Sequence, residues 1–308
     1  VVEQFNKIKI LFVCLFVVSV AGLLINSFVE FPWEGLRYTL DIYNVEASRA
    51  EETIFGIKRL AGFSRFAFDA AVQIILVSIF LVVHIKNNFI KVIIWCIAGL
   101  AIVLTTVKGI ILSYLLISML LLLQVVDNKM MDYYHIYRKI FLMLLTMVFF
   151  LPFLSYFAKD IGSIKLIGDS VDMLFTSFAV RLYDTWPEVI DIVQNYGNPI
   201  LGRGLGGIGQ PQVFFENNLY NSCDNLFIYL YAQFGVIGII YIVYFYLKSR
   251  SLSAKNDLYF CLLLFIILQF GITSSIFETP LLCLFVGFLL AHITNPKLRM
   301  EYQKRLSM

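Results

Sequence analysis

Residues 226–247 read LFIYLYAQFGVIGIIYIVYFYL, an apolar stretch of 22 residues without a charged side chain. A helix needs about 20 mostly apolar residues to cross a hydrocarbon layer about 30 Å thick. The stretch therefore predicts a transmembrane helix. Seven further runs of this kind, of which the last is short, occupy residues 10–28, 66–83, 89–106, 110–126, 140–157, 258–274 and 280–293.

The composition is typical of a protein that lipid solvates. Hydrophobic residues make up 60% of the 308 residues and charged residues 15%, with a mean hydropathy of +0.82. Soluble domains have roughly 45–50% apolar and about 25% charged residues. This excludes a cytosolic enzyme, a nucleic-acid-binding protein and a secreted disulfide scaffold. We predict an all-α polytopic membrane protein with about eight transmembrane helices, forming one integral membrane domain over residues 1–308.

The charges predict how the chain is oriented in the membrane. Lys and Arg concentrate in cytoplasmic loops, and eight spans that start inside give the inner segments a net charge of +9 and the remainder −6. We therefore expect cytoplasmic termini and two long external segments, residues 29–65 and 158–223. The first run lacks a small-residue cleavage site, so we expect no removable signal peptide. The start at Val1, in the middle of the charge pattern, hints at further helices upstream.

The positions of the cysteines, histidines and charged residues also limit the possible functions. Four of the five cysteines lie in predicted spans, and no Cys or His cluster has metal-ligand spacing. We therefore predict no metal and no cofactor. The span centres are nearly free of charge, which is unlike an ion pump. Lys108 and Glu278 lie near external span ends, either as interface residues or as parts of an outward-facing site.

An amphipathic helix is predicted in the second external segment. Arg181 and Trp186 precede a stretch in which Val189, Ile190 and Val193 recur at helical spacing. The guanidinium of Arg181 can bind a phosphate with two parallel hydrogen bonds. The alternative is a surface ion pair between Arg181 and Asp184.

A glycine-rich loop follows, reading NPILGRGLGGIG over residues 198–209. It contains G-x-G-x-x-G, but no βαβ unit surrounds it and no Lys-Ser or Lys-Thr follows, so neither a dinucleotide site nor a P-loop is indicated. Gly202 and Gly204 permit positive φ angles, which suits either an anion-binding nest around Arg203 or simply a tight loop.

Two polar positions lie at predicted helix starts. Asp224 and Asn225 stand at the start of the 226–247 run. An Asp there can be a helix N-cap, or a carboxylate that orients or deprotonates an acceptor hydroxyl. Glu278 precedes Pro280, which suits a first helical turn, so Glu278 can also simply favour the helix dipole.

These motifs, in this order, resemble the O-antigen ligase and polymerase superfamily over about residues 55–290. The pattern is Arg181 five residues before Trp186, then the Gly-x-Gly loop, then a polar pair before LFIYL. Residues 59–65 (RLAGFSR) resemble the family's Arg-containing first loop, and residues 105–109 (TTVKG) resemble its Thr-x-Ser-Arg-Gly stretch. The turn with Phe277 and Glu278 is similar to that of the polymerase branch.

The resemblance implies a metal-independent, membrane-embedded glycosyltransferase that acts on undecaprenyl-diphosphate-linked oligosaccharides at the outer face of a bacterial plasma membrane. Arg181 matches the external-loop Arg of the family, and Arg59 or Arg65 its first-loop Arg. Lys108 replaces an Arg, which keeps the charge but loses the planar fork. The candidate catalytic residues are Arg181, Asp224, Asn225 and Glu278, and the candidate substrate-binding residues are Arg59, Arg65, Lys108, Arg203, Gly202 and Gly204.

Within the superfamily we expect a polymerase of repeat units for O-antigen, capsule or exopolysaccharide, because ligases carry His where this sequence has Asp224. A ligase that moves finished glycan to another acceptor remains the alternative, and a transporter without catalysis is the third hypothesis. A chain-length regulator and a repeat-unit flippase are partners that the resemblance implies.

Overall fold

The computed structural model describes residues 2–32, 39–40, 45–46, 53–54, 57–126, 130–158, 178–250, 252, 257–274 and 276–306. The predicted external segments 29–65 and 158–223 fall partly outside these ranges. Four short strands lie in the first segment and form two antiparallel pairs, β1 (Thr39–Leu40) with β2 (Val45–Glu46) and β3 (Thr53–Ile54) with β4 (Ile57–Lys58). Apart from these pairs, the secondary structure of the described residues is helical.

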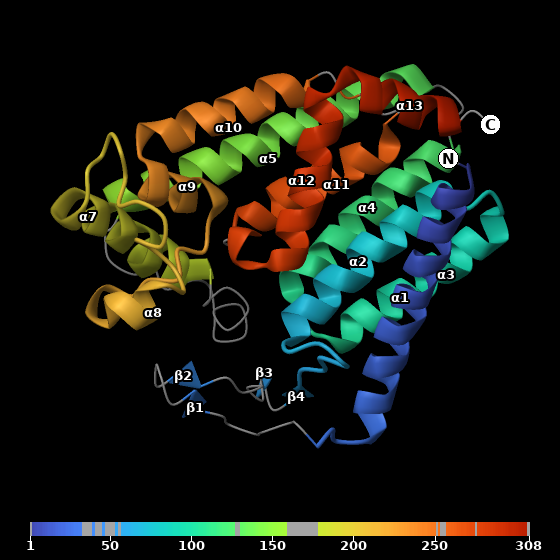
Figure 1. Ribbon diagram of the computed structural model, residues 1–308, viewed down its shortest axis with the longest axis horizontal. Coiled ribbons are helices and arrows are strands. Elements are labelled where there is room, and N and C mark those ends of the chain that lie inside the picture. The colour runs from blue at the N-terminus through green and yellow to red at the C-terminus, as the bar shows by residue number, and fades with distance from the viewer. Residues whose placement is uncertain are drawn as a thin grey trace. The chain divides into compact units, whose positions relative to one another are not determined.

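Helix occupies most of each predicted span (Figure 1). The helices in the first part of the chain are α1 (Val2–Phe28), α2 (Ala67–His84), α3 (Asn88–Leu104), α4 (Lys108–Val126) and α5 (Met130–Ala158). The later ones are η2 (Arg181–Thr185), α7 (Trp186–Tyr196), α8 (Gln212–Phe215), η3 (Asn217–Leu219), α9 (Leu226–Phe234), α10 (Val236–Ser249), α11 (Leu258–Gly271), η4 (Ile276–Glu278), α12 (Pro280–Thr294) and α13 (Pro296–Leu306).

Several of these helices are suited to a membrane. Among the described residues, three helical stretches are long and apolar enough to cross one, namely Lys7–Phe28, Ala67–His84 and Lys139–Phe157. Shorter apolar helices cover Asn88–Leu104, Lys108–Leu122, Val236–Ser249, Leu258–Gly271 and Pro280–Thr294. The fold is thus compatible with the helical membrane protein that the sequence predicts.

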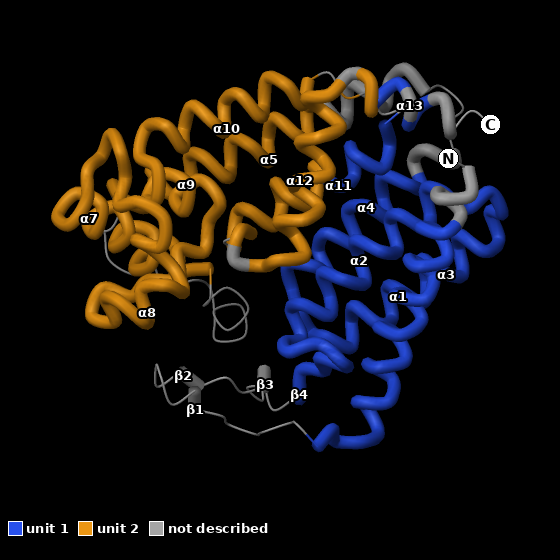
Figure 2. Tube along the Cα trace, viewed as in Figure 1, with its two compact units in different colours: residues 1–128, 257–263, 299–308 blue, residues 129–256, 264–298 orange. Residues whose placement is uncertain are grey.

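The chain divides into two compact units (Figure 2). The first comprises residues 1–128, 257–263 and 299–308, and α2 lies in its core, with Val72, Ile74 and Ile75 fully buried. Helices α1 and α3 pack on α2. The second unit comprises residues 129–256 and 264–298, in which α7 and α9 pack together and against α5.

A polar cluster in the first unit fastens the C-terminal helix α13. Asp257 is fully buried and accepts hydrogen bonds from Arg299 Nη2 at 2.6 Å and from Gln303 Nε2 at 3.0 Å. The Tyr302 hydroxyl lies 2.9 Å from His84 Nε2 at the end of α2. Burial raises the pKa of Tyr302, which keeps its phenol neutral. These contacts hold α13 against α2 and the start of α11.

The prediction of one continuous span over residues 226–247 is wrong. The helix breaks at Gly235, where φ is 56° and ψ is −138°, and α9 and α10 lie on either side. The two helices pack closely, because a Cβ added to Gly238 would lie 2.3 Å from the carbonyl oxygen of Leu230. The carbonyl oxygen of Ile200 accepts a hydrogen bond from Val236 N at 3.0 Å, which binds the glycine-rich loop at the break. We call this break the elbow.

The amphipathic helix predicted around residues 187–196 is confirmed as α7, with Val189 and Val193 fully buried. A π-turn, η2, precedes it, in which Trp186 N donates to the carbonyl oxygen of Arg181. Pro187 lies in the first turn of α7 and has no N–H to donate. Single π-turns of this kind occur frequently at functional sites, and this one contains Arg181.

Candidate functional site

An ion pair between Arg181 and Asp224 lies where η2 meets the start of α9. Arg181 Nε and Nη2 both donate to Asp224 Oδ2, at 3.1 Å and 3.0 Å. The side chains are 24% and 28% exposed. Partial exposure leaves the pair within reach of a substrate, while partial burial strengthens its field compared with open water. The guanidinium and the carboxylate are therefore suited to bind polar groups of a ligand together.

Trp186 holds the two halves of this pair in place. Its side chain is fully buried, and its indole N–H donates to the backbone carbonyl oxygen of Asp224 at 3.2 Å. Phe178 packs edge-on against the indole, with ring centroids 5.9 Å apart. Since Trp186 comes directly after η2, it ties the backbone of Asp224 to the helix that bears Arg181.

Asn225, and not Asp224, caps α9. Asn225 Oδ1 accepts hydrogen bonds from Phe227 N at 2.8 Å and Ile228 N at 3.1 Å. Its Nδ2 donates to the carbonyl oxygens of Val148 and Ile272, and the residue is fully buried. The interpretation of Asp224 as a helix cap is thus wrong. Because Asn225 satisfies the helix start, the carboxylate of Asp224 can pair with Arg181.

The backbone turns sharply just before Asp224. Cys223 is fully buried and has φ of 48°, a left-handed conformation that residues with a side chain seldom adopt. Cys223 N donates to Asn221 Oδ1 at 2.9 Å, and Asn225 N donates to the carbonyl oxygen of Cys223 at 2.6 Å. Such unusual backbone angles persist only where surrounding contacts enforce them, and they cluster at functional sites.

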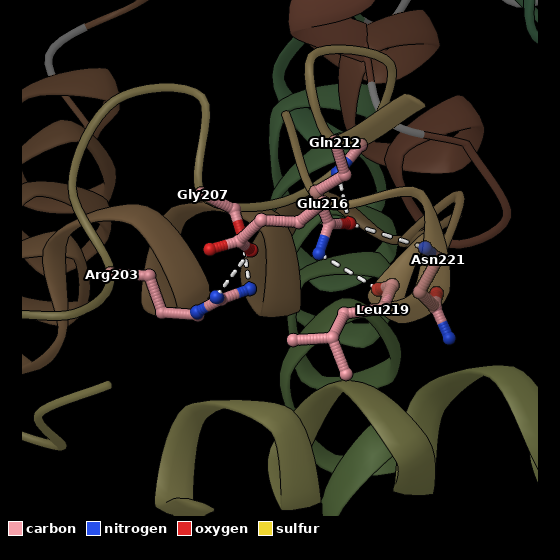
Figure 3. A network of polar contacts seen from close by, with 7 residues as sticks. Arg203, Gly207, Gln212, Glu216, Leu219 and Asn221 are labelled. Atoms are coloured by element: carbon pink, nitrogen blue, oxygen red, sulfur yellow. Dashed lines mark hydrogen bonds and ion pairs between the residues drawn. The ribbon is translucent and has the colours of Figure 1, made fainter. Parts of the chain in front are cut away.

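A buried amide network connects this turn to the loop before it (Figure 3). Gln212 is 1% exposed, and its Oε1 accepts from Gly209 N and Asn221 N, each at 3.1 Å. Gln212 Nε2 donates to the carbonyl oxygen of Leu219 at 2.8 Å. Asn221 Nδ2 in turn donates to Glu188 Oε2 at 2.7 Å. The network fixes residues 209–221 against α7, and Asp224 follows directly from it.

The glycine-rich loop docks on the C-terminal end of α9. Arg203 N donates to the carbonyl oxygen of Ala232 at 2.7 Å, and Gly204 N to that of Gln233 at 3.0 Å. These bonds satisfy carbonyls that a helix end leaves without an intrahelical partner. A Cβ on Gly202, where φ is 77°, would lie 2.5 Å from the carbonyl group of Gln233. Close approach of the loop to α9 therefore requires glycine here.

The side chain of Arg203 turns inward within the same loop (Figure 3). It is 5% exposed, and Nη1 donates to the carbonyl oxygen of Gly207 at 2.6 Å. Nη2 forms an ion pair with Glu216 Oε2 at 2.5 Å. Arg203 thus bridges two parts of the loop that are 13 residues apart.

The remaining predicted site residues lie elsewhere. Arg59, Arg65 and Lys108 belong to the first unit, whereas Arg181, Asp224 and the glycine-rich loop belong to the second. The Arg65 guanidinium carbon lies 4.8 Å from the ring centroid of Phe66, and Lys108 is the exposed first residue of α4. Glu278 ends η4, and its side chain is outside the described residues.

Sequence reasoning missed the supporting amides Gln212 and Asn221, because polar residues in a loop carry no pattern that reveals their partners. It also missed Gln233, a polar residue inside an apolar run. That position gave a usable signal, since a polar side chain in a stretch of membrane-helix character is retained only with a partner or a function.

Comparison with known proteins gives one family match that includes this site. Residues 92–243, just under half of the chain, match the family model described as O-antigen ligase. No curated protein and no solved structure matches the chain. The matched stretch contains Arg181, the glycine-rich loop and Asp224, and the match is consistent with the O-antigen polymerase and ligase superfamily that the sequence motifs resemble.

Proposed function

We propose that this protein polymerises undecaprenyl-diphosphate-linked oligosaccharide repeat units into a surface polysaccharide, such as O-antigen, capsule or exopolysaccharide. The observation that carries the proposal is the partly exposed Arg181–Asp224 pair, which lies inside the stretch that matches the family. The pair supplies a cation for a departing diphosphate and a carboxylate for an acceptor hydroxyl.

The chemistry follows from the two side chains. A sugar hydroxyl of the acceptor attacks the anomeric carbon of the donor, the bond from that carbon to the diphosphate oxygen breaks, and the lipid diphosphate departs. Arg181 stabilises the negative charge that develops on the departing oxygen. The carboxylate of Asp224 orients the hydroxyl and takes its proton. When the guanidinium of Arg181 binds the diphosphate, its ion pair with Asp224 weakens, and the carboxylate becomes available to the hydroxyl.

The other predicted residues take supporting roles in this proposal. Arg59 or Arg65, and Lys108, stay candidate diphosphate-binding residues on the ground of the family resemblance alone. Arg203, Gly202 and Gly204 give the loop its shape, since Nη1 and Nη2 of Arg203 and the backbone N–H groups of both glycines already donate within the fold. Glu278 stands near the acceptor, and Asn225 positions Asp224.

The site lies at the external face of a bacterial plasma membrane in this proposal, with both chain termini in the cytoplasm and the whole chain acting as one membrane domain. A repeat-unit flippase supplies the substrate to that face, and a chain-length regulator acts on the product. No metal ion takes part, because the cation that the reaction needs is a guanidinium.

The test is an assay with protein purified in detergent, a lipid-diphosphate-linked repeat unit and EDTA. We expect a ladder of glycans that grows with time. Asp224→Asn preserves the size of the side chain and removes its basicity, so it should lower the rate by roughly 100-fold or more. A substrate that stays unchanged with folded wild-type protein would refute polymerisation, and full activity of Asp224→Asn would refute the base role.

Ligation to another acceptor is the second candidate, because the matched family model is described as a ligase. The two functions leave different products in a strain that lacks the gene. Loss of a polymerase leaves single repeat units on the carrier lipid, whereas loss of a ligase leaves long chains there. A gel of lipid-linked material from the deletion strain separates the two.

A further inference from the structure

A cavity of about 650 Å³ lies at the elbow, beside the glycine-rich loop. Leu205 of the loop, Tyr229 and Gln233 of α9, Tyr241 of α10 and Phe277 of η4 line it. This volume is in the range of about 300–1,000 Å³ that small-molecule sites occupy. Residues on both sides of the break at Gly235 line the cavity.

Gln233 is the polar residue of this cavity that points to a ligand. The residue is 6% exposed as a whole, and no hydrogen bond of its side-chain amide is found within the described part of the chain. Its amide atoms are not fully buried, so they are accessible from the cavity that the residue lines. Only its backbone carbonyl oxygen is engaged, by Gly204 N at 3.0 Å. A polar group that faces a largely apolar cavity is stabilised by a hydrogen-bonding partner there. A bound molecule with a hydroxyl or an amide would supply the partner that Gln233 lacks.

The lining also restricts the charge of that molecule. Of the described residues around the cavity, none is charged, so the cavity does not suit a diphosphate. Tyr229 stacks on Phe277 with ring centroids 6.2 Å apart and planes at 22°, and Tyr241 adds a third aromatic wall. Aromatic faces pack well against the C–H faces of a sugar ring. A bare prenyl chain would fill the apolar space but would leave the amide of Gln233 unsatisfied.

The position of the cavity fits the reaction site. Both ends of α9 touch the loops before it, through Arg181 and Asp224 at the start and through Arg203 and Ala232 near the end. Tyr229 comes three residues after Leu226, the first residue of α9, which is a rise of about 4.5 Å along the helix, and Asp224 precedes Leu226 by two residues. This separation is on the scale of a short oligosaccharide, so a glycan held at Asp224 can extend toward the cavity.

We propose that the cavity is a subsite for an uncharged sugar of the lipid-linked oligosaccharide, with Gln233 hydrogen-bonded to a hydroxyl or acetamido group of that sugar. Gln233 thereby selects which repeat unit the protein accepts. The inference rests on the proposed function and names a specificity-determining residue for it.

The experiment measures binding directly, on the full-length protein in detergent. The probe is the repeat-unit oligosaccharide released from its lipid carrier, and the readout is saturation transfer from protein to sugar protons in NMR. Gln233→Leu removes the amide and keeps the volume, while Gln269→Leu is the matched control, since Gln269 is also 6% exposed and lies outside the cavity. We expect Gln233→Leu to weaken binding roughly 5- to 10-fold and Gln269→Leu to bind as wild type.

A second variant and a second probe complete the test. Tyr241→Ala, at a side chain that is 39% exposed, removes an aromatic wall and should weaken binding even if Gln233→Leu folds poorly. Undecaprenyl diphosphate without sugar should leave the sugar signals in place. If this lipid abolishes them, the cavity holds the prenyl chain and the proposal is overturned. The same conclusion follows if wild type gives no transfer, or if both cavity variants bind as wild type.

The outcomes also separate this inference from the proposed function. Polymerisation by a Gln233→Leu variant with an unchanged KM for the lipid-linked substrate would remove the subsite and leave the polymerase. Sugar binding that depends on Gln233, without any new glycosidic bond, would keep the subsite and remove the polymerase.

Discussion

An arginine that pairs with an acidic residue lies beside each end of α9, but the two arginines differ in their exposure to solvent. At the start, Arg181 and Asp224 form an ion pair that is 24% and 28% exposed. Near the end, Arg203 is 5% exposed, and its Nη1 and Nη2 donate to Gly207 and Glu216. The comparison teaches that an arginine beside an acid indicates a ligand site only where the fold leaves the pair within reach of solvent.

The largest expected effect is at the elbow, which separates the two ends. A Cβ on Gly235 would lie 2.3 Å from the carbonyl oxygen of Ile200, at a φ of 56°. Because the atom that the new Cβ meets belongs to the backbone and cannot rotate away, Gly235→Ala should cost about 3 kcal/mol or more. We expect loss of the folded peak in size-exclusion chromatography. Gly287→Ala is the control, since its Cβ would meet nothing within 4 Å. Normal folding of Gly235→Ala would contradict the conclusion that the elbow requires glycine at this position.

The next effect is on catalysis, at the start of α9. Arg181→Ala should reduce turnover roughly 100-fold or more, by analogy with the loss of a donor that stabilises developing charge. Its thermal unfolding temperature should change little, because exposed and partly exposed ion pairs contribute about 0–1 kcal/mol. Arg181→Lys should recover only part of the rate, since Lys lacks the planar fork. Rates of glycan extension under equal protein amounts measure this, and turnover near the wild-type value would exclude Arg181 from the reaction.

Substitutions at Asn225 and at Asp224 should separate an effect on stability from an effect on activity. Asn225→Ala removes the cap of α9 and leaves the carbonyl oxygens of Val148 and Ile272 without that donor. We expect a loss of about 2–3 kcal/mol in the free energy of unfolding. Asp224→Ala should cost about 1 kcal/mol or less, yet abolish activity. Thermal unfolding in detergent compares the two variants, and equal stability losses would mean that Asp224 also supports the fold.

The smallest effect concerns Arg203, at the end of α9. Arg203→Ala should lower stability by about 1–2 kcal/mol, because it removes a buried hydrogen bond to Gly207 and an ion pair. Glu216→Gln, at a side chain that is 44% exposed, should cost less. Activity should fall only in proportion to the folded fraction. A stable Arg203→Ala protein with a much reduced rate would instead make Arg203 a substrate ligand.

The sequence by itself determined the helical membrane character and most of the local structure. Apolar run length located the helices, and the spacing of Val189 and Val193 gave the buried face of α7. Pro280 marked the start of α12. These features depend on residues close together in the chain, so composition and periodicity are enough to predict them. The order of the motifs also indicated the family.

Only the tertiary structure decided which polar groups remain available to bind a ligand. The Arg181–Asp224 pair joins residues 43 positions apart, and Asn225, not Asp224, caps α9. The break at Gly235 depends on a loop that enters from residues 200–204, and the apolar run gave no sign of that contact. Hydrogen bonds and burial between distant segments set these choices, because each donor can serve the fold or a ligand and local sequence does not say which.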